Sequence, residues 1–400
     1  MKDELRYLYP SLPLPRSLSA RAARAFRWRA NRVRERVPPL LPIIREIRLA
    51  TNRRFAVVGA DLLSAWLREG IHPRAFVGNL MWEVPVERRH EFVSGTEIDR
   101  FFAATIDSED RLLVRDKAAF ADHARRRGMP WLPTLAIVNR HEGTPVDAAS
   151  ILDEKRDLVL ALDRLADDHD VFLKPSCGKQ GRGVYRYARG GRTRDADGDE
   201  VALHDLVEQI FAYRHPDGDF GYVVQRALDP HPDVVALTGV DVLATVRVVT
   251  AVRDGATHIL QFLLKIPAPG RVTDNVHGGL TGTMVAGVDP ASGTLLDLVG
   301  ILRPGNRFVR ERTGVHPVTG RRIGGRELPD WRNVLDLARR AALLHPRTAT
   351  LGWDVGLTPS GWVFLDVNAK WGPAGSQVCT GEGMKPALAL LFPDHFTGHQ

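Results

Sequence analysis

The stretch GWDVGLTPSGWVFLDVNA, residues 352–369, contains two strand-like runs separated by the turn sequence PSG. Proline, serine and glycine between two such runs are typical of a β-hairpin. Asp354 interrupts the first run, and Asp366 and Asn368 interrupt the second. Because side chains alternate along a strand, Asp366 and Asn368 point to one face, and a short turn brings Asp354 opposite them.

These three residues suggest a metal site. Two carboxylates and an amide oxygen are hard ligands suited to Mg²⁺, which commonly also binds substrate phosphates. Carboxylates among apolar strand residues need a cation or hydrogen bonds to be tolerated. The alternative interpretation is a structural pair of acids that is capped or salt-bridged.

A second stretch, VFLKPSCGKQGRGVYRY at residues 171–187, has an apolar run ending at Lys174, a glycine-rich loop and a second strand-like run. The chain has 8 lysines against 47 arginines, so Lys174 and Lys179 beside this loop stand out. A lysine is a compact point charge suited to one phosphate oxygen, and glycine-rich backbone can face phosphates. The loop glycines are Gly178, Gly181 and Gly183.

Other interpretations of the loop stay open. It is neither a Walker A loop nor a Rossmann turn, because no G-K-[ST] opens a helix and a strand follows the glycines. An ordinary glycine-rich hairpin would have the same pattern. Lys179 and Arg182 could contact phosphate or be solvated. Cys177 could be a nucleophile or a small residue in a tight turn.

A third feature is the strand pair LATVRVVTAVR and THILQFLLKIP, joined by DGA. Arg247 and Lys265 lie among apolar residues there, and Asn275 and His277 follow. Without an obvious acid on the same strands, the two cations suggest an anionic ligand. The alternative is a salt bridge to an acid elsewhere, such as Asp241.

The rest of the chain predicts helices mixed with antiparallel hairpins, which indicates an α+β fold. Residues 54–70 predict a strand, a glycine turn and a helix, and residues 110–115 predict a loop before a helix at about 116–127. Residues 330–345 predict a helix that Asp330 can cap.

Charge is concentrated at the N-terminal end. Residues 1–54 contain fourteen basic and four acidic residues, a net charge of +10, so the rest of the chain carries −3 of the overall +7. The body therefore does not resemble a nucleic-acid binder. The arginine-rich run at 17–37 predicts a helix that lies on an anionic partner or membrane surface, or else a solvated helix packed on the body through Leu18, Phe26, Trp28 and Val33.

No apolar run is long enough to span a membrane, and the first residues lack the apolar core of a secretory signal. Two cysteines, Cys177 and Cys379, do not make a disulfide framework. A cytoplasmic protein is the simplest expectation. The sequence does not predict an oligomeric state.

Taken in order, the motifs resemble the ATP-grasp superfamily over roughly residues 110–375. The matching stretches are RDKAAFADHARRRGMPWLP, VFLKPSCGKQGRGV, YVVQRAL, TVRVVTAV with LLK and DNVHGGL, and GWDVGLTPSGWVFLDVNA. The chain looks closest to the sugar-transfer-associated ATP-grasp and glutamate-ligase-like subgroup. The resemblance implies an ATP-grasp fold with two α+β subdomains that clasp ATP. It implies a central subdomain at 116–226 and a C-terminal subdomain at 227–400. The residues before them match no family motif, and their own patterns predict a basic helical extension at 1–54 and an N-terminal α/β region at 55–115.

The resemblance also implies roles for individual residues. The residues expected to bind ATP are Lys117, Lys174, Gly178, Lys179, Gly181, Gly183, Gln225, Arg226 and Leu228. Asp354, Asp366 and Asn368 would hold one or two Mg²⁺ ions, with Mn²⁺ as a substitute. Arg247, Lys265 and Asn275 would act on the transferred phosphoryl and the acceptor carboxylate.

The implied reaction joins a small-molecule or peptide carboxylate to an amine through an acylphosphate, releasing ADP and phosphate. His231, His277 or His316 could serve as the base. A kinase acting on a hydroxyl and a non-catalytic nucleotide-binding partner stay open as alternatives. Two departures from the family pattern are Asp366 where glutamate is usual and Gln225 where glutamate is frequent.

Overall fold

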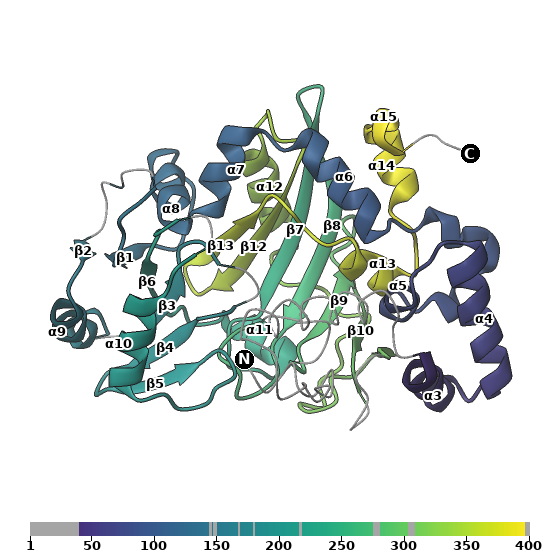
Figure 1. The fold of residues 1–400 in the computed structure, drawn as a ribbon, viewed down its shortest axis with the longest axis horizontal. Helices are drawn as coiled ribbons and strands as arrows, with labels where there is room; N and C mark the ends of the chain where they lie inside the picture. Colours follow the sequence, from purple (N-terminus) through teal and green to yellow (C-terminus); the bar gives the residue numbers. More distant parts are fainter. Residues whose placement is uncertain are drawn as a thin grey trace, which may run out of the picture.

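The computed structural model describes residues 40–143, 146, 150–166, 169–178, 181–215, 218–274, 281–302 and 309–396. The predicted arginine-rich helix at 17–37 lies outside the described residues, as do Lys179, Asn275 and His277. Two β-sheets dominate the described part, with helices around them (Figure 1). None of the helices described there has both the length and the apolar character needed to cross a membrane.

A six-stranded sheet carries the glycine-rich loop. Its strand order is β2-β1-β6-β3-β4-β5, and all neighbours are antiparallel except β1 and β2. The strands are β1 (Thr134–Val138), β2 (Ser150–Leu152), β3 (Val171–Pro175), β4 (Tyr185–Ala188), β5 (Arg192–Asp195) and β6 (Tyr222–Arg226). Helices α9 (Lys155–Leu165) and α10 (Leu203–Ala212) bury Leu158, Leu162 and Leu206 against one face.

A seven-stranded antiparallel sheet, in the order β11-β10-β9-β8-β7-β12-β13, forms the centre of the molecule. Its strands are β7 (Thr245–Arg253), β8 (Ala256–Ile266), β9 (Met284–Val288), β10 (Leu295–Gly300), β11 (Glu311–Thr313), β12 (Thr350–Thr358) and β13 (Gly361–Asn368). The two hairpins described above are present as β7–β8 and β12–β13, and a third one, which the strand-like runs on either side of PASG at 290–293 also predict, is present as β9–β10. The β7–β8 turn holds Asp254 and Gly255 at positive φ, which the Asp-Gly pair tolerates well.

Both faces of the seven-stranded sheet are covered, which explains its nearly continuous apolar strands. Helix α12 (Trp331–Ala342) packs on one face, against residues such as Val248 and Leu264. Helices α3 (Leu40–Thr51), α4 (Phe55–Arg68), α5 (Pro73–Gly78) and α13 (Ala374–Thr380) share a core with Leu263, Val285 and Val299 on the other face. Arg247 pairs across the ladder with Leu263 and with Asp354, so the predicted site lies on this second face.

The remaining elements complete the envelope of the molecule. They are η1 (Met81–Glu83), η2 (Val86–Glu91), α6 (Gly95–Thr105), α7 (Ser108–Arg115), α8 (Lys117–Arg126), α11 (Pro232–Thr238), α14 (Lys385–Leu391) and α15 (Pro393–Phe396). Helix α8 runs beside β1 of the six-stranded sheet, and α7 contacts β13 of the other, so this helix pair connects the two sheets.

Three local predictions are wrong. Residues 55–68 form one helix, α4, rather than a strand, a turn and a helix; Val58, Leu62 and Ala65 are buried at helical spacing, so a short apolar run was misread. The predicted loop before residue 116 is helix α7, capped by Asp107. Asp330 precedes α12 in a left-handed conformation and its side chain does not cap the helix.

Candidate active site

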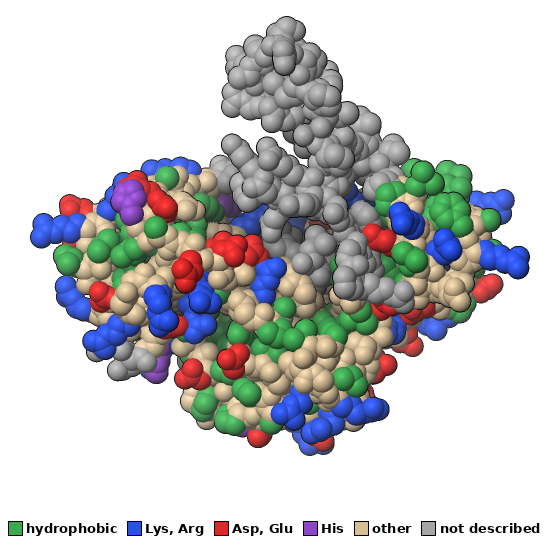
Figure 2. All heavy atoms as spheres, turned by 90° about the horizontal axis from the view of Figure 1, so that it is seen from below, with side chains coloured by type: hydrophobic (Ala, Val, Ile, Leu, Met, Phe, Trp, Pro, Cys, Tyr) green, Lys and Arg blue, Asp and Glu red, His purple; other side chains and the backbone are tan. Residues whose placement is uncertain are grey.

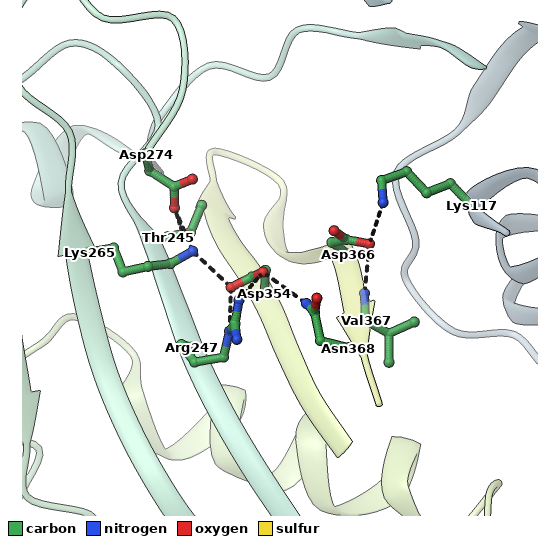
Figure 3. A network of polar contacts seen from close by, with 9 residues as sticks. All are labelled: Lys117, Thr245, Arg247, Lys265, Asp274, Asp354, Asp366, Val367 and Asn368. Carbon is green, nitrogen blue, oxygen red and sulfur yellow. Dashed lines mark hydrogen bonds and ion pairs between the residues drawn. The ribbon is translucent and has the colours of Figure 1, made fainter. Parts of the chain in front are cut away.

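Asp354 lies at the centre of a charged cluster on β12 (Figure 3). Arg247 on β7 donates to both of its oxygens, each at 2.7 Å, and the Lys265 ammonium lies 2.9 Å from Oδ1. Lys265 also pairs with Asp274 at 2.8 Å, and Thr245 donates to Asp274. Although burial alone would raise the pKa of Asp354, the two cations hold it well below its ordinary value.

The cluster shows which acids form ion pairs with Arg247 and Lys265. The sequence showed no acidic partner on their own strands, yet their partner stands on the neighbouring strand β12 and is Asp354, not Asp241. Burial lowers the pKa of Lys265, but Asp274 and Asp354 outweigh that effect and raise it. Both cations are therefore held in fixed positions by carboxylates, which sequence reasoning missed because cross-strand pairing is not a local pattern.

Asp366 and Asn368 follow on β13, and the predicted register is present. Asp354 pairs with Asp366 and Gly352 with Asn368, with an irregularity in the ladder just after Asp354. The Asn368 amide donates to Asp354 at 3.4 Å. Lys117 lies 3.2 Å from Oδ1 of Asp366, and the Val367 amide donates to the same oxygen at 3.0 Å. The three predicted metal ligands thus meet at one edge of the sheet (Figure 3).

Lys117 is positioned by Asp116, a residue the sequence reasoning had not singled out. Asp116 caps α8 by accepting from the backbone of Ala118. It also accepts from Ser176, which follows Lys174, at 2.6 Å and from Arg140 at 2.6 Å. An aspartate directly before a helix is a common N-cap, but its contacts with Ser176 and Arg140 come from segments distant in the chain. The contacts tie the lysine of the helix to the start of the glycine loop.

Lys174 is the penultimate residue of β3 and lines the cavity described below. Its ammonium lies 5.1 Å from the centre of the Phe172 ring, and no described residue forms an ion pair with it. Burial lowers the pKa of Lys174 to about 8, with Asp366 acting in the opposite direction. A partly buried ammonium without an ion-pair partner is a binding position for an anion.

The glycine loop needs glycine at Gly183. The residue has φ +69°, and a Cβ there would stand 2.8 Å from the Tyr222 hydroxyl oxygen. A side chain at this position would therefore force the loop away from Pro175 and Tyr222. Gly181 also has positive φ, at +68°.

One cavity of about 640 Å³ joins these features. Of the predicted nucleotide residues, those lining it are Lys117, Lys174, Gly178, Gly181, Arg226 and Leu228. The cluster residues Arg247, Lys265, Asp274, Asp354, Asp366 and Asn368 line it as well. Gln225 does not line it: its side chain is buried in the sheet, and Oε1 has no hydrogen-bond partner there.

Three candidate reactive residues have structural positions instead. Cys177 is fully buried, and burial raises its thiol pKa to about 12, which does not suit a nucleophile. His231 caps α11 through Nδ1, and buried His316 accepts from the backbone of Thr319. Neither histidine lines the cavity.

Most of this architecture lies within the part of the chain that matches a known protein family. Residues 98–390 match the family model described as sugar-transfer associated ATP-grasp. The chain belongs to this family. The ATP-grasp fold accordingly spans both sheets and the cavity between them, from α6 to α14. No curated protein matches the sequence.

Solved structures similar to this ATP-grasp chain are distant. The D-Ala:D-Ser ligase VanG of Enterococcus faecalis is 11% identical, with a TM-score of 0.39 over 72% of this chain and 64% of its own. D-alanyl-alanine synthetase A of Vibrio cholerae is 11% identical, with a TM-score of 0.40 over 70% and 65%. The biotin carboxylase domain of Hydrogenobacter thermophilus 2-oxoglutarate carboxylase, in complex with MgADP and bicarbonate, is 13% identical, with a TM-score of 0.33 over 68% and 46%. The chain thus spans about half to two thirds of their lengths.

Proposed function

We propose that this ATP-grasp chain is an ATP-dependent ligase that joins a carboxylate to an amine through an acylphosphate, releasing ADP and phosphate. One observation supports this most directly. Lys174, which has no ion-pair partner within the described part of the chain, shares a cavity with the candidate oxygen ligands Asp366 and Asn368 and with the paired cations Arg247 and Lys265. These groups support separate places for phosphate, metal and acceptor within one cavity.

The nucleotide fits the side of the six-stranded sheet. Lys174 and Lys117 would bind phosphate oxygens, and the loop glycines would let backbone amides approach them. The backbone after β6, from Arg226 to Leu228, lines the same cavity and offers peptide groups to the base. A volume of about 640 Å³ is within the range of small-molecule sites.

A magnesium ion fits the ligand set of β13. Both described contacts to Asp366 are made to Oδ1, while Asn368 uses its amide nitrogen toward Asp354. Oδ2 of Asp366 and the amide oxygen of Asn368 are thus the oxygens best placed as ligands. Asp354 has both oxygens engaged by Arg247 and Lys265, so its coordination of metal would require sharing them. Bound Mg²⁺ would neutralise charge developing on the phosphates.

The acceptor carboxylate would lie beside Arg247 and Lys265, the two cations of the cluster that line the cavity. Arg247 and Lys265 are held rigidly by Asp354, so little side-chain ordering is needed when an anion arrives. They would steady the negative charge on the acceptor carboxylate and on the transferred phosphoryl group. The carboxylate oxygen attacks the γ-phosphorus, ADP leaves, and the amine then displaces phosphate from the acyl carbon.

The test is product analysis with hydroxylamine in place of the amine. Purified protein, MgATP and pools of candidate acids should give ADP together with a hydroxamate. AMP and pyrophosphate would refute the acylphosphate route, and a stable phosphorylated alcohol would indicate a kinase. The Asp366→Asn variant serves as the control for contaminating ATPases, because it should lose the metal site while keeping the fold.

A further inference from the structure

The outer face of helix α4 is unusually apolar for a surface helix. Six of the fifteen exposed large hydrophobic side chains among the described residues belong to α3, α4 and their short connection. On α4, Ala56, Ala60, Leu63 and Leu67 recur at helical spacing and are all exposed, with Leu67 76% accessible. Residues at this spacing share one face of a helix, so they form a continuous stripe.

The acids of these helices are turned away from the stripe. Asp61 and Glu69, the only acids within residues 55–69, both pair with Arg89, at 2.9 Å and 3.5 Å. The Arg89 side chain is only 4% exposed, so this ion-pair group lies toward the interior. On α3, Glu46 accepts from the backbone of Val309. The exposed part of the two helices is consequently left without a free carboxylate among the described residues.

Arginines supply the charge around the stripe. Arg54 and Arg68 are exposed at the two ends of α4, and Arg45 and Arg48 are exposed on α3. Figure 2 shows apolar and basic side chains next to one another at its right-hand end, where α3 and α4 lie in Figure 1. The sequence immediately before α3, residues 1–39, adds ten basic and three acidic residues.

We propose that the exposed face of α3 and α4 docks on a membrane surface that contains anionic lipid. Apolar side chains would enter the interface between headgroups and acyl chains, while the arginines pair with lipid phosphates. A soluble acidic partner would explain the arginines but not the exposed leucines. A second copy of the chain would bury the leucines but bring like-charged arginines together.

The test is sedimentation of the full chain with vesicles of phosphatidylcholine, with and without 30% phosphatidylglycerol, a composition of about the charge found on anionic membranes. Binding is expected only with phosphatidylglycerol and should weaken several-fold as salt rises. The variant Leu63→Glu/Leu67→Glu should lower partitioning at least about tenfold, because two apolar contacts are replaced by charges that anionic lipid repels. ATP affinity should stay unchanged, since neither residue lines the cavity.

The matched control is Leu160→Glu/Leu390→Glu, which places the same charges at exposed leucines on α9 and α14. It should bind vesicles like the wild type, and Arg45→Glu/Arg48→Glu should bind as poorly as the α4 variant. Equal binding by the wild type and the α4 variant would overturn the proposal, as would the absence of binding to anionic vesicles. A dimer in light scattering that the α4 variant dissociates would also overturn it in favour of a second copy.

Discussion

The basic side chains of the two sheets that face the cavity differ in their ion-pair partners. On the seven-stranded sheet, Arg247 and Lys265 are each held by carboxylates, at 2.7 Å and 2.9 Å from Asp354. On the six-stranded sheet, Lys174 stands over the face of Phe172 and forms no ion pair among the described residues, although Asp366 acts on it from a longer distance. The first group is electrically balanced before any ligand binds, whereas the second carries an uncompensated charge.

The difference separates two kinds of role. A cluster whose charges are paired is stable without a ligand. It also holds its side chains in a fixed geometry, ready to stabilise charge that develops during a reaction. An unpaired, desolvated ammonium lowers the stability of the free protein, and an anion that binds to it removes this cost. Removing a member of each group should therefore damage different properties: the fold for the balanced cluster, and affinity for the unpaired lysine.

The largest effect is expected for Asp354→Ala. The change leaves Arg247 and Lys265 close together without their shared carboxylate, in a buried position. Breaking such a pair typically costs about 3–5 kcal/mol of unfolding free energy. Urea denaturation should show this loss, and ligase turnover should disappear with it. A loss below about 1 kcal/mol would mean that Asp274 alone balances the two cations.

The next effect separates the metal site from the balanced cluster. Asp366→Asn and Asn368→Ala should each lower Mg²⁺-dependent turnover by about a hundredfold or more, because the first removes the negative charge of a ligand and the second removes a ligand oxygen. Asp366 is 29% exposed, so stability should fall far less than in Asp354→Ala. Isothermal calorimetry should still show nucleotide binding without metal. Near-normal turnover in Asp366→Asn would place the metal elsewhere.

Lys174→Ala should give the reverse pattern. Loss of a charge-assisted contact to phosphate costs about 1.5–3 kcal/mol, which is roughly a ten- to hundredfold weaker affinity for ATP. The unfolding free energy without ATP should be unchanged or higher, because an unpaired buried charge is removed. Lys265→Ala is the matched control, since it should lower stability instead. Wild-type ATP affinity in Lys174→Ala would show that phosphate binds elsewhere.

Whether a feature of this protein can be predicted from its sequence depends on how far apart in the chain the contacting residues lie. The hairpin carrying Asp354, Asp366 and Asn368 is read correctly because alternation and a short turn are local signals. The misread segment is α4, where Phe55 to Val58 suit a strand as well as a helix and only packing decides. The contact between Asp116 and Ser176 escaped prediction because the two residues are 60 positions apart in the chain. The same limit hid the acid that pairs with Arg247.

The smallest effect is a pH dependence that belongs to Lys174 alone. Burial lowers its pKa in the folded protein to about 8 from an ordinary value of 10.5. Between these two pH values the unfolded chain binds more protons at this site than the folded one, so the stability contributed by Lys174 rises with pH through this window.

Without ATP, Lys174→Met should accordingly be more stable than the wild type at pH 7, by about 1–2 kcal/mol once partial contact with water is allowed for. The gap should narrow by pH 9.5, where the folded wild type has lost most of the Lys174 charge. Urea denaturation of the pair at both pH values measures the gap. If the difference in unfolding free energy between the two proteins does not change with pH, the Lys174 ammonium is solvated or paired in the folded protein. Lys174 would then not differ from Arg247 and Lys265 in the way described above.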